Sequence, residues 1–324
     1  MNSPKYSIVI PVYNRPEELT ELLESLVSQT YSNFEVIVIE DGSTLSSETV
    51  VQQYQDRLRI EYFFKFNSGP GPSRNVGFQK ANGEYFVVFD SDCLLPPHYF
   101  ESVEHFITSH KVDAWGGPDR GHSTFTLLQQ AMAHTMSSLF TTGGIRGGTK
   151  MIGKYQPRSF NMGISRETFL KTGGFHFDRF AEDIDLSIRM KKLGLQVWLI
   201  PEAFVFHKRR ANLTQFFQQV YNFGKGRVMV EHFHPGEVKW VHWLPAFFLG
   251  GIIFTTGAYF FNRKLGIILS AGYVVYLLLV ALDGARKSKS ISMAILAIPA
   301  VFTQMIGYGA GFLAQKIKYL HGNK

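Results

Sequence analysis

Two acidic stretches follow apolar runs that have the length and composition of buried strands. Residues 34–39 lead into Glu40-Asp41-Gly42-Ser43, and residues 85–89 lead into Asp90-Ser91-Asp92. Alternate residues of an extended segment can direct two carboxylates toward one hard cation, so Asp90 and Asp92 predict a site for Mg²⁺ or Mn²⁺. Such an ion commonly keeps coordination positions for phosphate oxygens, where it neutralises charge on a diphosphate leaving group.

A further acidic cluster, Glu182-Asp183-Ile184-Asp185, opens a stretch whose apolar residues recur at helical spacing. The N-terminus of a helix stabilises a carboxylate and lowers its pKa. The cluster therefore predicts either a general base or a helix cap, and its three acids compete for the first role.

Other chemistries lack their residues in this sequence. Cys93 is the single cysteine, so a thiolate zinc site and an intrachain disulfide are excluded, and no Gly-x-x-x-x-Gly-Lys-Ser/Thr sequence occurs. The chain from Trp240 onward carries eight Lys or Arg and one Asp, a net charge of +7, which leaves residues 1–239 with none. The basic charge flanks apolar runs, so a nucleic-acid partner is not expected.

Alternating strand and helix patterns in residues 1–239 must position these acids. Strands are expected at 6–12, 34–39, 59–64 and 85–89, and helices at 17–28, 48–54 and 73–80. This order predicts an α/β fold with a largely parallel sheet covered by helices on both faces. Ligands of such sheets bind beyond the carboxyl ends of the strands, where we expect the acidic strand ends to meet.

Five short motifs follow one another in the order and spacing of a known enzyme family. They are Pro11-Val12-Tyr13-Asn14-Arg15, Val36-Ile37-Val38-Ile39-Glu40-Asp41-Gly42-Ser43, Ser73-Arg74-Asn75-Val76-Gly77, Asp90-Ser91-Asp92 and Glu182-Asp183-Ile184-Asp185-Leu186. Over roughly residues 5–210 the chain resembles the family 2 glycosyltransferases. The resemblance implies the GT-A fold, a Rossmann-like mostly parallel sheet, and sugar transfer with inversion at the anomeric carbon.

The resemblance also implies roles for individual residues on the side of a nucleotide-diphosphate sugar donor. It places Pro11, Tyr13 and Asp41 around the nucleoside and Arg74, Asp90 and Ser91 near the base, phosphates, ribose or sugar. It makes Asp92 a ligand of Mn²⁺ or Mg²⁺, with His207 as a second ligand. Asp183 becomes the general base.

Inversion by direct attack of an acceptor hydroxyl requires the same groups, because it needs a carboxylate on the acceptor side and a metal on the donor side. Asn161 and Glu182 are further candidates for the acceptor side or a lid. The glycine-rich stretch 141–153 reads equally as a mobile loop over the site or as a plain connection.

Three charge-free runs at 243–261, 265–282 and 291–314 have the length of membrane-spanning helices. They predict a transmembrane region at 240–324 after a cytoplasmic catalytic domain at 1–239, in a multi-pass protein of a bacterial inner membrane. Residues 213–233 predict an amphipathic helix, either on the membrane surface or packed on the catalytic core. Charge counts leave open which of the three runs span and where the C-terminus lies.

The combined prediction is a metal-dependent transferase that adds a single sugar, from a UDP-linked donor, to a lipid-linked saccharide or glycolipid acceptor. Single addition is expected because the Gln-x-x-Arg-Trp motif of processive synthases is absent, which favours exopolysaccharide-type relatives. Two alternatives remain: transfer to a polyprenyl phosphate, and a nonenzymatic membrane subunit that binds sugar nucleotides. A nucleotidyltransferase is disfavoured, since its glycine-rich, lysine-containing N-terminal loop is missing.

Overall fold

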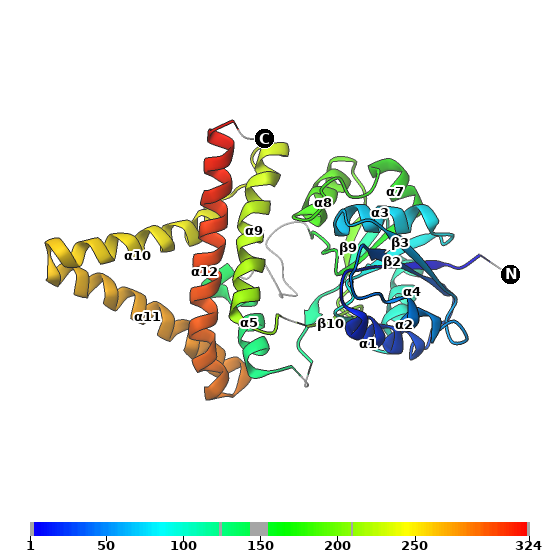
Figure 1. Cartoon of the computed structure of the whole chain (residues 1–324), viewed down its shortest axis with the longest axis horizontal. Helices are drawn as coiled ribbons and strands as arrows, with labels where there is room; N and C mark the ends of the chain where they lie inside the picture. The colour runs from blue at the N-terminus through cyan, green and yellow to red at the C-terminus, as the bar shows by residue number, and fades with distance from the viewer. Residues whose placement is uncertain (1–2, 123–124, 143–154, 209, 323–324) are drawn as a thin grey trace. The chain divides into compact units, whose positions relative to one another are not determined.

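The computed structural model describes residues 3–122, 125–142, 155–208 and 210–322, and it divides into two units (Figure 1). The first unit comprises Met1–His122 and Gly153–His207. The second comprises Ser123–Ile152 and Lys208–Lys324. Most of the loop expected at 141–153 lies outside the described residues.

A seven-stranded sheet with the order β3-β2-β1-β4-β8-β6-β9 forms the centre of the first unit. Its strands are β1 (Tyr6–Val12), β2 (Phe34–Asp41), β3 (Ile60–Lys65), β4 (Tyr85–Phe89), β6 (Ala114–Gly116), β8 (Asn161–Ser165) and β9 (Val197–Leu199). The four strands β1 to β4 are mutually parallel, and β8 runs antiparallel to both β4 and β6. The predicted α/β fold with a mostly parallel sheet is confirmed.

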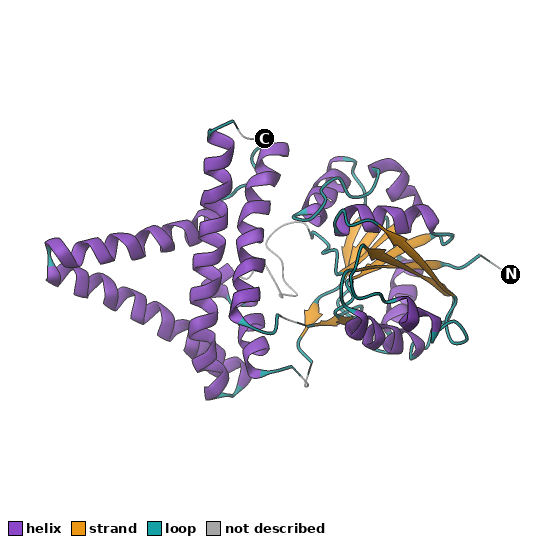
Figure 2. Ribbon diagram, viewed as in Figure 1, coloured by secondary structure: helices purple, strands orange, loops and turns teal. Residues whose placement is uncertain are grey.

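Helices cover both faces of this sheet because alternate residues of its strands are buried on opposite sides (Figure 2). In β1, Ile8 and Ile10 face one apolar layer, and Val9 faces the other. The first layer receives residues of α1 (Pro16–Val27), α2 (Glu48–Gln52) and α4 (Tyr99–Ser109). The second receives residues of α3 (Pro70–Lys80), α7 (Arg166–Thr172) and α8 (Glu182–Lys192).

A small second sheet joins segments that are far apart in the sequence. It has the order β5-β10-β7, with β5 (Cys93–Leu94), β7 (Asp119–Arg120) and β10 (Val205–His207). Its antiparallel pairing places His207 opposite Cys93. The residue that precedes Cys93, Asp92, is thereby brought beside the end of β10.

The second unit is helical. It contains α5 (Leu127–Ser137), α6 (Leu139–Thr142), α9 (Leu213–Phe233), the 3₁₀ turn η1 (Trp240–Trp243), α10 (Leu244–Phe261), α11 (Arg263–Ser288) and α12 (Ile291–Leu320). The segments Trp240–Phe261, Arg263–Ser288 and Ile291–Leu320 are long and apolar enough to cross a membrane. All three predicted apolar runs therefore form helices of the expected kind.

Candidate active site

The carboxyl ends of β1, β2, β3 and β4 lie at one edge of the sheet, since these strands are parallel. Asn14 ties the first two ends together. Its backbone has a left-handed φ of 53°, and its side-chain oxygen accepts hydrogen bonds from the amides of Thr44 and Leu45 at 2.8 and 2.9 Å. The turn after β2 is thus held against the end of β1.

Asp41, expected to meet the nucleotide base, is buried at this edge in a set of donors. Lys65 Nζ lies 2.5 Å from Asp41 Oδ1, and the amides of Ser68 and Gly69 each donate to the carboxylate at 2.9 Å. Burial alone raises the pKa of Asp41, but the hydrogen bonds from Lys65 and the two amides lower it on balance. Asp41 is therefore an ionised anchor for the loop between β3 and α3.

The other two expected nucleoside contacts differ in exposure. Pro11 is partly buried within β1, where it pairs with Ile39. Tyr13 lies beyond the end of the strand with 51% of its surface exposed. An exposed aromatic ring next to a polar strand end is available to stack on a base.

Arg74, on α3, is buried between two carboxylates. Its guanidinium donates to Asp90 Oδ1 at 2.7 Å and to Glu182 Oε1 at 2.8 Å, and only 2% of the residue is exposed. The contact with the base or phosphates that the resemblance implies stays a prediction. One side chain thus joins the end of β4 to the start of α8.

Asp92 forms the other part of the β4 end and is also buried. Arg15 Nη1 lies 2.6 Å from its Oδ2, and His207 Nε2 lies 3.1 Å from its Oδ1. Cys93 Sγ belongs to the same group of potential metal ligands, with all three ligand atoms within 4.8 Å of one another. The pairing of β5 with β10 accounts for the approach of His207.

The oxygen and nitrogen of this pair suit Mn²⁺ or Mg²⁺. Two neighbouring ligands about 2.1 Å from an octahedral ion lie about 3 Å apart, which agrees with the Asp92 Oδ1 to His207 Nε2 separation of 3.1 Å. Burial, followed by the charges of Asp92 and Asp90, raises the pKa of the Cys93 thiol well above its usual value. Cys93 is therefore a neutral thiol, and Asp92 with His207 are the residues that fit the ion.

Ser91 and Asn161 are buried rather than presented at the edge. Asn161 opens β8 beside Phe89, donates from Nδ2 to the Ala203 carbonyl at 2.8 Å and accepts from the Tyr99 hydroxyl at 2.6 Å. Both ends of its side chain are thus engaged inside the fold.

The three acids at the start of α8 have different environments. Glu182 is buried against Arg74, and burial raises its pKa although the guanidinium opposes this. Asp185 is buried and bound by Arg189 at 2.6 Å. Asp183 has the most exposed side chain of the three, at 15%, and Arg158 Nη1 lies 3.6 Å from its Oδ2. Of the three, Asp183 is the carboxylate best placed to meet another molecule.

Sequence reasoning did not single out Lys65, Arg15 or Arg158, which balance the charges of Asp41, Asp92 and Asp183. Lys65 carried a usable signal, because it ends a predicted strand at the same sheet edge as Asp41. Arg15 lies inside a recognised motif. For Arg158 the local sequence holds no such signal, since its partner is distant in the chain.

Residues 7–177, more than half of the chain, match the profile of Glycosyl transferase family 2. The chain belongs to this family. It is 44% identical over 116 residues to an uncharacterised glycosyltransferase of Rickettsia bellii, a match that covers 34% of this chain and 17% of the relative. It is 35% identical over 113 residues to the poly(ribitol-phosphate) beta-N-acetylglucosaminyltransferase TarS of Staphylococcus aureus, covering 34% and 20%. The matched segment spans a fifth or less of either relative.

Solved structures share the fold. The mannosyltransferase PcManGT of Pyrobaculum calidifontis, in complex with GDP-Man and Mn²⁺, superposes with a TM-score of 0.61 at 17% identity, covering 100% of this chain and 89% of the other. Residues 1–349 of TarS from S. aureus, in complex with UDP-GlcNAc, give a TM-score of 0.51 at 18% identity, covering 98% and 92%. The first unit accordingly has the GT-A-like fold that the sequence predicted.

Proposed function

We propose that this glycosyltransferase moves one sugar from a UDP-linked donor to a membrane-associated acceptor, with a divalent ion and inversion at the anomeric carbon. The observation that carries the proposal is the position of Arg74, whose guanidinium touches both Asp90 and Glu182. The metal-binding end of β4 and the acidic start of α8 therefore flank a single side chain. Inverting transfer needs a donor-side metal and an acceptor-side base on opposite sides of the reacting carbon.

On the donor side, Asp92 and His207 would hold the ion and Arg15 balances the buried charge of Asp92. A divalent ion held by these residues would stabilise negative charge on the departing diphosphate. Tyr13 and the Asp41 region would contact the nucleoside.

On the acceptor side, Asp183 takes the proton of an acceptor hydroxyl. The hydroxyl oxygen forms a bond to the anomeric carbon while the bond from that carbon to the diphosphate oxygen breaks on the opposite face. The electron pair of the broken bond leaves with UDP. Arg158 Nη1 lies 3.6 Å from Asp183 Oδ2, beside the carboxylate that receives the proton.

The choice of UDP and of a membrane acceptor rests on separate support. TarS, related to this chain over 113 residues, is named as an N-acetylglucosaminyltransferase, and its structure was solved with UDP-GlcNAc. PcManGT carries GDP-Man on the same fold, so the fold alone does not choose the base. The three long apolar helices favour a lipid-linked saccharide or glycolipid acceptor in cell-surface polysaccharide or glycolipid synthesis.

The test is nucleotide release by the full chain in detergent, with panels of UDP-sugars and GDP-sugars, Mn²⁺ or Mg²⁺, and extracted membrane lipids. We expect one UDP-sugar to support metal-dependent release of UDP together with a labelled lipid product. Asp183→Asn should bind UDP as the wild type does and lose product formation. Asp92→Ala should lose the response to metal.

Three results would count against the proposal. Turnover of a GDP-sugar alone would reject UDP as the donor nucleotide. Full activity of Asp183→Asn would remove Asp183 as the base. UDP-sugar binding without turnover in the presence of a competent lipid acceptor would favour a nonenzymatic binding subunit.

A further inference from the structure

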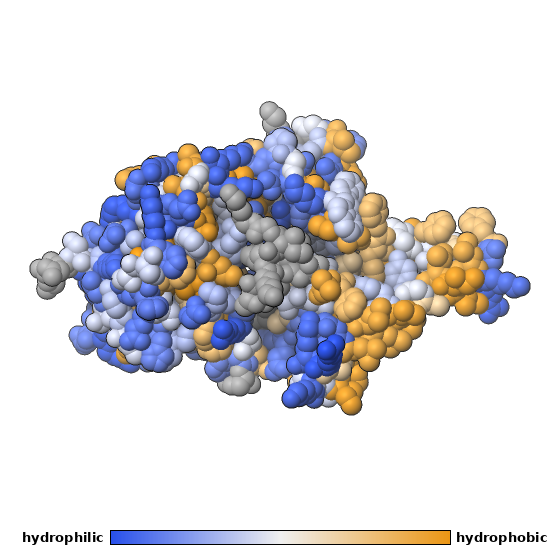
Figure 3. All heavy atoms as spheres, turned by 180° about the vertical axis from the view of Figure 1, so that it is seen from behind, coloured by the Kyte–Doolittle hydropathy of each residue, from blue (hydrophilic) through white to orange (hydrophobic). Residues whose placement is uncertain are grey.

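Helices α10 and α11 form a hairpin whose two arms pack on each other. Tyr259 packs on Gly266 and its hydroxyl lies 3.1 Å from Ser270 Oγ, while the Tyr273 hydroxyl donates to the Phe248 carbonyl at 2.9 Å. In the most apolar 18-residue stretch of each segment, 17% of the α10 segment and 11% of the α11 segment are buried inside the protein, compared with 44% for α12. Large apolar side chains cover the projecting helices (Figure 3).

The two helices of this hairpin contact α12 at two different positions along its length. At the start of α10, the Pro245 carbonyl lies 2.5 Å from where a Cβ on Gly309 would be. At the end of α11, Val280 packs on Val301 and Met305. Helix α12 therefore runs across the base of the hairpin instead of alongside it, and Figure 1 shows the hairpin projecting away from α12.

Helix α9 lies beside α12 over most of its own length. Val220 packs on Gly307, the Tyr308 carbonyl lies 2.2 Å from where a Cβ on Gly224 would be, and the rings of His232 and Tyr319 stack 4.5 Å apart. The two helices thus run parallel, in close backbone contact.

This pairing decides whether α12 can cross a bilayer. If α12 spanned, α9 would enter the hydrocarbon with it, and α9 exposes Gln215 and Gln218 and carries Lys225 and Arg227. A charged side chain at the centre of a membrane helix costs about 2.5–3.5 kcal/mol even on insertion scales. The α9–α12 pair is suited to an interface, with one apolar side and polar groups that reach water.

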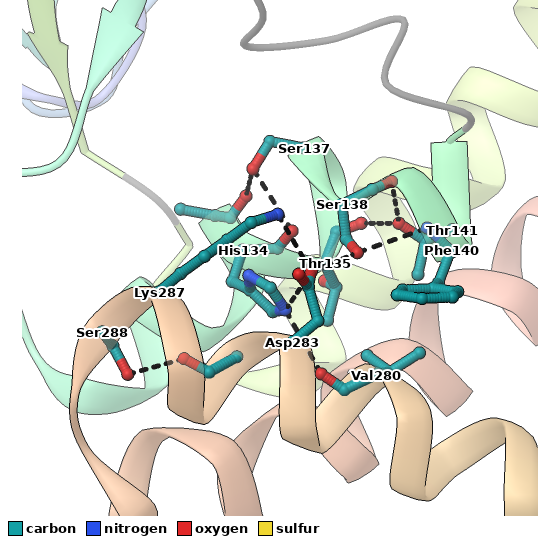
Figure 4. A network of polar contacts seen from close by, with 12 residues as sticks. His134, Thr135, Ser137, Ser138, Phe140, Thr141, Val280, Asp283, Lys287 and Ser288 are labelled. Atoms are coloured by element: carbon teal, nitrogen blue, oxygen red, sulfur yellow. Dashed lines mark hydrogen bonds and ion pairs between the residues drawn. The ribbon is translucent and has the colours of Figure 1, made fainter.

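The end of α11 is fastened to α5 by a polar network (Figure 4). Asp283 Oδ2 accepts a hydrogen bond from Ser138 Oγ at 2.8 Å, and His134 Nε2 and Lys287 Nζ lie 3.5 and 3.0 Å from it. In the chain, α5 lies between strands β7 and β8 of the catalytic unit, and the connection that leads into it, residues 121–126, is far shorter than the ~20 residues of a spanning helix. The end of α11 is therefore on the catalytic side of the membrane.

We infer that α10 and α11 cross the bilayer as a two-helix hairpin, whereas α12 and α9 lie along the membrane surface on the catalytic side. The 18 residues of α10 extend about 27 Å, close to the ~30 Å hydrocarbon thickness. The turn of the hairpin, residues 262–264, then emerges on the opposite side. The partner of the apolar hairpin is thus the lipid bilayer itself.

The charge distribution agrees with this two-pass arrangement. It places two basic clusters, residues 286–289 and 316–318, on the catalytic side, and leaves Arg263 and Lys264 as the far-side charges. Three spanning helices would separate the two clusters across the membrane. Basic residues concentrate on the cytoplasmic side of membrane proteins, so the arrangement also fits a cytoplasmic catalytic unit. At the base of α10, Lys316 Nζ lies over the Trp243 ring at 5.7 Å, which is a pairing typical of the lipid headgroup level.

Cysteine labelling of the full chain in sealed membrane vesicles tests the inference without reference to activity. The native Cys93 is buried and provides the background. Single variants Lys289→Cys, Lys318→Cys and Asn262→Cys are treated with a membrane-impermeant maleimide in vesicles whose catalytic side faces outward. Glu101→Cys, at an exposed position on α4, marks that side. His321→Cys and Lys264→Cys serve as second probes of the tail and the hairpin turn.

We expect Lys289→Cys, Lys318→Cys and His321→Cys to label like Glu101→Cys, and Asn262→Cys and Lys264→Cys to label only after detergent is added. If both tail variants were protected while Lys289→Cys was labelled, α12 would cross the membrane and the inference would be wrong. Labelling of both turn variants from the catalytic side would show that the hairpin does not cross, which overturns it equally.

Discussion

His207 Nε2 lies 3.1 Å from Asp92 Oδ1, across two short strands that come from distant parts of the chain. The contact depends on the register of β10 against β5, which puts His207 opposite Cys93 and so beside Asp92. Any residue that holds this register also holds Asp92 and His207 together. The site is therefore built by strand pairing rather than by a local sequence motif.

His207→Ala should weaken the response of turnover to Mn²⁺ while leaving nucleotide binding in the absence of metal unchanged. Loss of an outer-shell partner alone costs about 10- to 100-fold in metal affinity, so we expect at least this much for a ligand. The measurement is activity against Mn²⁺ concentration, with direct Mn²⁺ binding by electron paramagnetic resonance. Cys93→Ser is the matched control, since its neutral thiol should contribute little. An equal loss in Cys93→Ser would make the thiol a ligand.

Arg74→Met should destabilise the catalytic unit strongly, because it leaves Asp90 and Glu182 without their common cation. Removing one partner of a buried ion pair costs about 3–5 kcal/mol. The double variant Arg74→Met/Glu182→Gln should recover part of this loss, since one uncompensated charge is then gone. Thermal unfolding of the two single variants and the double variant measures the coupling. Strictly additive losses would show that Arg74 and Glu182 do not support each other.

Lys65→Met should make stability less dependent on pH in the acidic range. The pKa of Asp41 is lowered in the folded chain, so its stabilising contribution is complete above the unfolded pKa of about 4 and is lost as the pH falls through the folded value. Without Lys65 that pKa rises. The stability difference between wild type and Lys65→Met should therefore be largest near pH 7 and shrink below pH 4.

Unfolding measured from pH 7 to pH 3 checks this, with Arg57→Met as control. Arg57 and Glu24 form an ion pair with side chains 45% and 50% exposed, for which we expect little change in stability. A difference between wild type and Lys65→Met that stayed constant over the whole range would mean that Lys65 acts by packing and not through Asp41.

The parallel half of the sheet was predictable because each of its strands is a recognisable run of apolar residues. The buried runs at β1, β2 and β4 alternate with a helix whose leucines recur every three or four residues, and this order admits few topologies. The antiparallel strand β8 had no such signal, because Asn161–Ser165 is short and contains Gly163. Helix α3 begins at Pro70, before the predicted start at residue 73, since proline is favoured in the first turn of a helix.

The acids of the candidate site were predictable, whereas their partners were not. A carboxylate that follows a strand can be recognised from its position in the sequence. The cation that faces it is determined by tertiary packing, which the local sequence does not show. Arg74 shows the difference: its place in a motif suggested contact with the donor, and only the fold reveals that Asp90 and Glu182 surround it. The packing of α9 and α5 on α12 could not be predicted either, because the apolar periodicity of a helix does not show which surface its apolar face packs against.

Ser138→Ala should loosen the attachment of α11 to α5. Its hydroxyl donates to the Asp283 carboxylate at 2.8 Å, and a hydrogen bond to a charged group is worth about 1.5–3 kcal/mol. Ser137→Ala is the matched control, because the Ser137 hydroxyl bonds only to the carbonyls of Ala133 and His134 among the contacts described for it. Thermal unfolding in detergent and protease sensitivity of α5 compare the two. Equal behaviour of the two variants would show that the Asp283 network does not hold α11.

Gly311→Ala should push α9 and α12 apart, because a Cβ at this position lies 1.9 Å from the Tyr221 carbonyl. Backbone cannot yield as a flexible side chain does, so the helices must separate and lose packing along their shared length. Gly272→Ala, in α11, is the control, since nothing lies within 4 Å of its Cβ position and alanine favours a helix over glycine by about 1 kcal/mol. We expect a lower melting temperature for Gly311→Ala and an unchanged or higher one for Gly272→Ala. Equal stability of Gly311→Ala and the wild type would contradict the close α9–α12 contact, and with it the reason for placing α12 at the membrane surface.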